Sequence, residues 1–383
     1  MLSPKLSLRH TKYSQFVTDM LLILTFCYSR VAVCFMGFLT FQARPFLKLH
    51  EPTVIRSSSI FCSHGFLANR LLNGNAAMYR ILFVFQLLWA FVLPYQGWQS
   101  AIGEETSQTS TLDIPDAEIQ LYKTVNGKDL SLYVFKPPGH VTTDRRPAVV
   151  FFFGGGWIGG TPQQFVPHCR YLASRGMLAA TADYRVRSRQ GTTPFECVAD
   201  GKSAVRWLRH HAARLGVDPD RIAAGGGSAG GHVAAATGIV PGLDDPHDPT
   251  EISAQPNALL LFNPVYDNGP DGYGYDRVKE RYLEISPLHN IGPGAPPTIV
   301  FLGTRDDLIP MRTAQQFEDS MKAVGCRCET RFYVGQKHGF FNKGRADDKY
   351  FIATILETDK FLKSMGWLQG PPTVDEFMRD VNP

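Results

Sequence analysis

Apolar positions alternate with polar ones in two neighbouring stretches near the middle of the chain. The runs EIQLYKTV (118–125) and LSLYVFKP (130–137) are joined by NGKD, and an Asn-Gly turn between alternating runs is typical of a β-hairpin. The next run, AVVFFF (148–153), is continuously apolar, which is typical of a strand buried on both faces. The hairpin is therefore predicted to supply the antiparallel entry strands of a sheet.

Strand-like and helix-like patterns then follow one another over roughly 200 residues. Strands are predicted at 177–183, 221–226, 258–263, 298–303 and 329–334, and helices at about 165–175, 195–215, 229–237, 312–324 and 347–365. An irregular segment rich in Gly, Pro and Tyr interrupts the pattern from about 265 to 296. This alternation predicts an α/β fold with a mostly parallel sheet and helices on both of its faces.

The N-terminal part has a different pattern. Residues 1–77 contain few acids and no clean period, whereas Arg80, shortly after Met78, precedes the apolar block ILFVFQLLWAFVLPY. That block is about 15 residues long, shorter than a membrane span of about 20, and the small-residue sequence Ala-Ile-Gly follows it. We therefore expect translation to start at Met78 and residues 78–103 to be a secretory signal peptide. A genuine longer N-terminus with membrane anchors is the alternative.

These patterns divide the chain into segments. After the signal peptide, residues 104–115 are predicted to be a linker, residues 116–366 the α/β domain, and residues 367–383 a peripheral tail. The predicted location is secreted or periplasmic, and the alternative is anchoring in a membrane through the N-terminus.

Composition narrows the class of protein. The 383 residues are 44% hydrophobic and 19% charged, ordinary values for a globular protein, and a net charge of +4 is too small to indicate nucleic-acid binding. The CxC pair Cys326 and Cys328 fits neither a redox CxxC nor a zinc clip, so no metal or cofactor is predicted. Disulfides that involve these two, Cys169 or Cys197 are left open, and nothing in the sequence indicates an oligomeric state.

The sequence GGGSAGG (225–231) lies between a predicted strand and a predicted helix. It contains GxSxG from Gly226 to Gly230, the pattern of a serine on a sharp strand-to-helix turn with its hydroxyl exposed. Small residues are needed on both sides because the turn brings the two backbones close together. Ser228 is therefore the candidate nucleophile, although glycines and a serine also occur together in simple flexible loops.

A nucleophile of this kind needs an acid and a histidine base, which follow the serine in that order. His338 follows the last predicted strand, at the carboxyl edge where ligand sites of α/β folds gather. Asp306 follows the strand TIVFLG and is the predicted acid, with its neighbour Asp307 as the alternative because adjacent side chains diverge. The three other histidines after Ser228 are less suitable as bases: His232, His247 and His289. His232 is expected to pack under the turn.

Backbone donors for an oxyanion are predicted at Ala229, directly after the nucleophile, and at Gly155 and Gly156, in the loop after the strand 148–153. Glycine is needed in that loop because amides rather than side chains must approach the reacting oxygen. A phosphate-binding loop is not indicated, since neither GKS/T nor GxGxxG is present there.

Taken together, these motifs resemble the α/β-hydrolase superfamily, specifically the esterase branch of hormone-sensitive-lipase-like and bacterial acetyl or feruloyl esterases. The resemblance covers about residues 116–366 and rests on FFGGGW, ADYRV, DPDRIAAGGGSAGGH, ISPLHNI, GTRDDLIP and QKHGFF. It implies an α/β-hydrolase fold with a small cap segment. The site residues that it implies are Ser228, Asp306 and His338 as a catalytic triad and Gly155, Gly156 and Ala229 as an oxyanion hole.

The sequence departs from the family pattern at Phe153, where a histidine usually precedes the three glycines. Phenylalanine offers no polar contact, so we expect packing to set the glycine loop instead. The tripeptide Asp183-Tyr184-Arg185 also matches the family and is expected to be a structural brace.

The predicted activity is that of a serine carboxylesterase that works through an acyl-enzyme. The segment at about 265–289 is too short for a large lid domain, which favours short acyl groups on carbohydrate or other bulky alcohols. Trp157 and Tyr266 are predicted to contact such a small-molecule or oligosaccharide ester. The alternatives are a lipase or a serine peptidase on the same fold, or a noncatalytic binding module.

Overall fold

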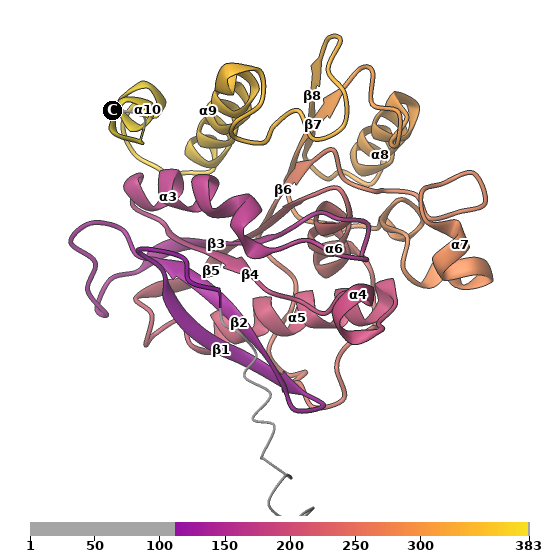
Figure 1. Cartoon of the computed structure of the whole chain (residues 1–383), viewed down its shortest axis with the longest axis horizontal. Coiled ribbons are helices and arrows are strands. Elements are labelled where there is room, and N and C mark those ends of the chain that lie inside the picture. The colour runs from indigo at the N-terminus through magenta and orange to yellow at the C-terminus, as the bar shows by residue number, and fades with distance from the viewer. Residues whose placement is uncertain (1–111, 382–383) are drawn as a thin grey trace, which may run out of the picture. The chain divides into compact units, whose positions relative to one another are not determined.

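A single mixed sheet organises the part of the chain that the structure, a computed structural model, describes, which is residues 112–381 (Figure 1). The predictions for residues 1–77, for the signal peptide at 78–103 and for most of the linker lie outside the described residues. The strands are β1 (Glu118–Val125), β2 (Lys128–Phe135), β3 (Arg146–Phe152), β4 (Leu178–Ala182), β5 (Val217–Gly227), β6 (Ala258–Phe262), β7 (Thr298–Gly303) and β8 (Cys328–Tyr333).

The strand order in the sheet is β1-β2-β4-β3-β5-β6-β7-β8. β1 pairs with β2 and β2 with β4 in the antiparallel sense, and all pairs from β4 to β8 are parallel. The structure thus confirms the predicted entry hairpin and the mostly parallel sheet. It belongs to the α/β-hydrolase type.

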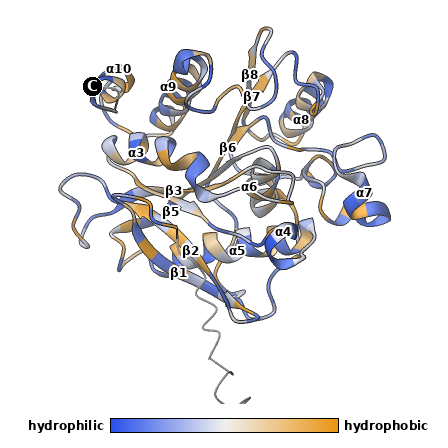
Figure 2. Cartoon of the chain, viewed as in Figure 1, coloured by the Kyte–Doolittle hydropathy of each residue, from blue (hydrophilic) through white to orange (hydrophobic). Residues whose placement is uncertain are grey.

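Helices cover both faces of this sheet. The longer ones are α3 (Val166–Ser174), α5 (Pro194–His210), α6 (Ala229–Ile239), α8 (Met311–Ala323), α9 (Lys349–Ser364) and α10 (Val374–Val381). Short helical turns lie between them: η1 (Pro162–Phe165), α4 (Arg187–Gln190), α7 (Tyr275–Val278), η2 (Lys279–Glu284), η3 (Pro287–Asn290) and η4 (Ala346–Asp348). In Figure 2, α8 and α9 carry both hydrophobic and hydrophilic colour, as expected of helices that pack by one side.

The core has two main parts because successive side chains of a strand point to opposite faces. In β3, Val150 and Phe152 join a cluster that contains residues of α5, α6 and α8. Val149 and Phe151 join a second cluster, which contains residues of α3, α9 and α10. Both faces of β3 are therefore buried, which explains its continuously apolar sequence.

The C-terminal tail is part of this second cluster. Residues 367–383 were predicted to be peripheral, but α10 buries Val374 and Phe377, and the Phe377 ring lies 5.4 Å from that of Tyr171 in α3. Trp367 and Leu368 are also buried. The proline-rich composition did not predict this packing, since Val374 and Phe377 are the buried residues among positions 374–380.

The tripeptide Asp183-Tyr184-Arg185 is a structural brace, as predicted. The Tyr184 hydroxyl donates to the Phe153 carbonyl at 2.6 Å. The Arg185 guanidinium donates twice to the buried carboxylate of Asp200, at 2.8 Å in both bonds. These contacts tie the chain after β4 to α5 and to the end of β3.

Among the residues from 112 to 381, no helix combines the length and the apolarity that crossing a membrane requires.

Candidate active site

Ser228 occupies the sharp turn between β5 and α6. Its φ of 54° and ψ of −120° are strained for a residue with a side chain. The turn is held from β6, because the Ser228 amide donates to the Phe262 carbonyl at 3.0 Å. Gly230 allows the close approach of helix and strand, since a Cβ there would lie 2.0 Å from the Phe152 oxygen. The strand, turn and helix therefore have the arrangement that the GxSxG pattern predicted.

His338 links this serine to a buried carboxylate. Its Nε2 lies 2.9 Å from Ser228 Oγ, and its Nδ1 lies 2.8 Å from Asp306 Oδ2. The other carboxylate oxygen of Asp306 accepts hydrogen bonds from the Leu308 and Ile309 amides at 3.0 and 2.9 Å. The Asp306 side chain is fully buried, whereas Asp307 is exposed. The structure thus brings together the three residues predicted as a triad, and it selects Asp306 over Asp307.

Asn263 supports the histidine loop and was not predicted. It follows β6, is fully buried, and its Oδ1 accepts a hydrogen bond from the Gly339 amide at 2.9 Å. Its Nδ2 lies 3.4 Å from His338 Nε2. The signal in the sequence is a polar residue at the carboxyl end of an otherwise apolar strand, LLLFN.

The glycine loop after β3 is held by side chains from other elements. Gln164 Oε1 accepts a hydrogen bond from the Gly154 amide at 2.6 Å, and Arg277 Nη1 donates to the Gly156 carbonyl at 2.7 Å. Gly155 and Gly156 have positive φ values of 128° and 63°, which favour glycine. Gln164 and Arg277 were not predicted, because contacts across the fold leave no mark in the local sequence.

The amides of Gly155, Gly156 and Ala229 point to a role outside the backbone hydrogen bonds of the described fold. None of the three makes a hydrogen bond to another residue in the range 112–381. Ala229 is the first residue of α6, where the backbone donors of a helix lack partners inside the helix. The three predicted oxyanion donors are therefore available to a ligand.

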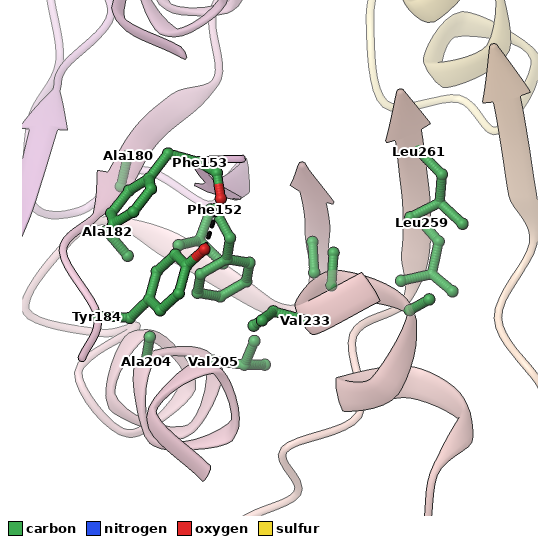
Figure 3. Packing of buried hydrophobic residues seen from close by; sticks show 14 of the residues in the cluster. Phe152, Phe153, Ala180, Ala182, Tyr184, Ala204, Val205, Val233, Leu259 and Leu261 are labelled. Atoms are coloured by element: carbon green, nitrogen blue, oxygen red, sulfur yellow. Dashed lines mark hydrogen bonds between the residues drawn. The ribbon is translucent and has the colours of Figure 1, made fainter. Parts of the chain in front are cut away.

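Phe153 holds its place in this loop by packing. Its ring is fully buried and stacks on Tyr184 with the ring centroids 4.2 Å apart (Figure 3). The hydrogen bond from the Tyr184 hydroxyl fixes the Phe153 backbone as well. Gly160 passes so close that a Cβ there would lie 2.5 Å from the phenyl ring. Stacking and close backbone packing thus hold the position where the family usually has a histidine.

A cavity of about 320 Å³ lies in front of Ser228 and His338. Its walls include Ile158, Gln164, Tyr273, Leu308, Asn342 and Arg345. This volume lies at the lower end of the range typical of small-molecule sites.

Trp157 and Tyr266, the predicted substrate contacts, do not line this cavity. Each has only 1% of its surface exposed, and the Tyr266 ring packs 4.8 Å from that of Phe317. Trp157 packs edge-on against His232 at 5.0 Å and lines a neighbouring cavity instead. Tyr273 is the tyrosine that lines the cavity at Ser228.

Two histidines near the site are buried in the core. His232 packs under the turn as predicted, with its Nε2 3.1 Å from the Ile285 carbonyl oxygen, and burial lowers its pKa to about 4. His168 lies among phenylalanine rings and has no hydrogen-bond partner within the described residues. Burial lowers the pKa of His168 to about 3. Both are therefore neutral at physiological pH.

The part of the chain that the structure describes contains neither a disulfide nor a cluster of metal ligands. Cys169, Cys197, Cys326 and Cys328 are free thiols. No group of three or more His, Cys, Asp or Glu side chains between residues 112 and 381 is arranged to hold a metal ion.

A serine on a strand-to-helix turn, linked through histidine to a buried aspartate at the carboxyl edge of a mostly parallel sheet, defines the α/β-hydrolase class. The unused amides beside the serine are typical of its members that transfer acyl groups.

Comparison with known proteins agrees with this class. Residues 132–258 match the family BD-FAE, and residues 274–366 match the dienelactone hydrolase family. The apo form of Thermogutta terrifontis esterase 2 is 48% identical, with a TM-score of 0.66, and the match covers 68% of this chain and 98% of that one. The chain therefore belongs to the carboxylic ester hydrolases of the α/β-hydrolase superfamily.

Curated relatives are more distant. The chain is 28% identical to the probable carboxylic ester hydrolase LipM of Mycobacterium tuberculosis, over 52% of this chain and 50% of the relative. It is also 28% identical to the probable isoprenylcysteine alpha-carbonyl methylesterase ICMEL1 of Arabidopsis thaliana, over 51% of this chain and 46% of the relative. The chain thus spans about half the length of the curated relatives that it matches.

Proposed function

We propose that the protein hydrolyses carboxylic esters through an acyl-enzyme on Ser228. The observation that carries the proposal is the pair of hydrogen bonds that joins Ser228 through His338 to Asp306. In this scheme His338 Nε2 takes the proton of Ser228 Oγ as that oxygen bonds to the ester carbonyl carbon. The proton then passes to the leaving alcohol, and a water activated by the same histidine releases the acid. Asp306 fixes the tautomer of His338 and stabilises the imidazolium.

The amides of Gly155, Gly156 and Ala229 would bind the negative oxygen that forms in each step. Their freedom from other hydrogen bonds supports this role, and α6 adds the positive end of its dipole. Loss of one such donor typically costs about 100- to 1000-fold in rate. The geometry of the glycine loop is therefore as important to this scheme as the triad.

The proposed substrates carry short acyl groups on carbohydrate or other bulky alcohols. The cavity of about 320 Å³ and its polar residues Gln164 and Asn342 support a small, partly polar ligand. The segment between β6 and β7 contains only short helical turns, so it leaves room for a bulky alcohol. Solved structures of Thermogutta terrifontis esterase 2 are described as propionate bound and butyrate bound, which supports short acyl groups here.

Covalent labelling tests the nucleophile. Paraoxon phosphorylates the Thermogutta terrifontis enzyme, and we expect it to add one phosphoryl group to Ser228 of this protein. Mass spectrometry should find the adduct in the wild type and in Ser320→Ala, a half-buried serine of α8, but not in Ser228→Ala. An adduct on another serine would overturn the assignment of Ser228. Absence of any adduct and of any ester hydrolysis would favour a noncatalytic binding module.

A substrate panel tests the acyl and alcohol preference. The comparison uses p-nitrophenyl acetate, butyrate and palmitate together with acetylated and feruloylated xylo-oligosaccharides. We expect the oligosaccharide esters to have the highest kcat/KM, because contacts to a bulky alcohol help to orient the ester. A clear preference for palmitate would reject the carbohydrate proposal and favour a lipase, and faster cleavage of peptides would favour a peptidase.

Export from the cytoplasm is proposed on the apolar block after Arg80. Sequencing the N-terminus of the native protein tests it. A mature chain that begins near Glu104 is expected, and residues retained upstream of Met78 would contradict both the signal peptide and the start at Met78.

A further inference from the structure

A second cavity of about 320 Å³ adjoins the one at Ser228. Gly156 and Ile158 line both cavities, and the second is completed mainly by Trp157, Arg187, Thr192 and Arg277. The shared residue Gly156 is also a proposed oxyanion donor. The two cavities are therefore neighbours at Gly156 and Ile158.

The second cavity is lined by more positive than negative charge. Arg187 is exposed, and its guanidinium has no hydrogen bond or ion pair with any residue between 112 and 381. Arg277 lies over the Tyr273 ring at 5.3 Å and donates to the Gly156 carbonyl. The single acid of the lining, Asp276, is 73% exposed and lies 3.9 Å from Arg277 Nε. Asp276 thus offsets one arginine and leaves Arg187 unopposed.

Two buried polar atoms in the lining also have no partner. Thr192 Oγ1 and Trp157 Nε1 are inaccessible to solvent and form no hydrogen bond within the described part of the chain. Buried polar groups are nearly always hydrogen-bonded. Neither atom is exposed to the open cavity, so each would pair with a ligand there only after its side chain turns toward it. The indole nitrogen can only donate, and a threonine hydroxyl can also donate. Together with Arg187 they form a set of donors.

We propose that the second cavity is a subsite for a carboxylate group of the ester substrate. A carboxylate supplies only acceptors, and the lining presents the exposed guanidinium of Arg187, so the two are complementary. The proposal rests on the proposed esterase function and narrows its substrates to esters that carry an acidic group on either the acyl or the alcohol part. A guanidinium also binds a carboxylate more strongly than it binds a neutral amide of the same shape.

Two substrate pairs test the proposal, one for each side of the ester. On the alcohol side, 4-acetoxybenzoate is compared with 4-acetoxybenzamide. On the acyl side, the p-nitrophenyl monoester of succinic acid is compared with its terminal amide, after subtraction of the uncatalysed rates. We expect the charged member of at least one pair to have about tenfold higher kcat/KM, the effect of one charge-assisted hydrogen bond. The pair that shows the preference identifies the side that enters the second cavity.

Arg187→Gln should reduce that preference to near one while leaving kcat/KM for p-nitrophenyl acetate within about twofold of the wild type. The matched control is Arg312→Gln in α8. Arg312 is exposed, has no ion pair with residues 112–381 and lines neither cavity. Both variants lose one positive charge, so a general effect of net charge would appear equally in both. Equal rates within both pairs for the wild type, or an unchanged preference in Arg187→Gln, would overturn the subsite. Failure of the wild type to hydrolyse p-nitrophenyl acetate would instead overturn the esterase function.

Discussion

Two neighbouring carboxylates at the candidate site differ in burial, and this difference predicts which of them supports catalysis. Asp306 is buried and bonded to His338, whereas the neighbouring Asp307 is exposed. Asp306→Asn should lower kcat about 10,000-fold, because an amide cannot stabilise the imidazolium and favours the wrong tautomer. Asp307→Asn should stay within a few-fold of the wild type. Steady-state kinetics with p-nitrophenyl acetate measure both, and a larger loss in Asp307→Asn would show that the acid is misassigned.

Gln164 offers a second test at the scale of one residue. Gln164→Leu removes the oxygen that accepts the Gly154 amide, so the glycine loop loses one of its fixed points. We expect kcat/KM to fall roughly tenfold or more, since the loop donors serve mainly the transition state and Gln164 also lines the cavity at Ser228. Gln163→Leu is the control, because Gln163 is exposed and, among residues 112–381, its side chain is hydrogen-bonded to Thr161 alone. An equal loss in both variants would contradict a specific role of Gln164.

The sequence predicted the residues whose chemistry is tied to a motif. Ser228, Asp306 and His338 each follow a strand, and parallel strands bring their carboxyl ends to one edge, so their meeting was predictable. The direction of a side chain was not predictable. Tyr266 was therefore predicted to contact the substrate, although the structure buries it away from the cavity. Asn263 was missed for a related reason, since its role depends on a loop distant in the sequence.

At the scale of elements, the packing of α6 against β3 depends on Gly230. A Cβ at this position would lie 2.0 Å from the Phe152 oxygen and 2.3 Å from the Phe153 oxygen, and backbone atoms cannot yield as flexible side chains do. Gly230→Ala should therefore lower the free energy of unfolding by roughly 3 kcal/mol or more. Urea denaturation measures this. Gly292→Ala is the control because a Cβ there would meet nothing within 4 Å, and a similar loss in Gly292→Ala would refute the clash.

Long periodic elements were predictable and short ones were not. Burial patterns repeated over β3, α5 and α8 are strong enough to be read from the sequence alone. The four-residue helices α4 and α7 contain one turn each, too little for an apolar period to appear. Their conformation depends on contacts with the rest of the fold.

At the scale of the whole molecule, buried neutral histidines make stability depend on pH. The pKa values of His168 and His232 are lowered to about 3 and about 4 by burial, whereas an unfolded chain titrates them near pH 6.5. Between these values the unfolded state binds more protons than the folded state. The free energy of unfolding should therefore fall by about 1.4 kcal/mol per pH unit for each histidine as the pH drops below about 6, and these groups should have no effect above about pH 7.

Denaturation between pH 4 and pH 8 checks this dependence. His168→Phe should reduce the slope by about one proton, since a phenyl ring suits the aromatic surroundings and cannot be protonated. His210→Gln replaces an exposed histidine and should keep the wild-type slope. An unchanged slope in His168→Phe would contradict the assignment of acid sensitivity to this residue.

The order of strands in the sheet belongs to this scale as well. Alternation of strand and helix predicted the layers, but it did not predict that β4 lies between β2 and β3. That order depends on which way each crossover turns relative to the strands already paired. Local sequence does not specify this direction, because it is a property of the assembled sheet.

The hydrogen bond from Arg277 to the Gly156 carbonyl limits how this enzyme can be redesigned or diversified. Arg277 belongs to α7, in the segment where a designer would insert or exchange residues to admit new substrates. Any such graft also alters a support of the loop proposed to bind the oxyanion, so substrate range and turnover are expected to change together. Libraries that keep Arg277 and vary its neighbours should separate the two traits, and libraries that randomise it are expected to contain fewer active members.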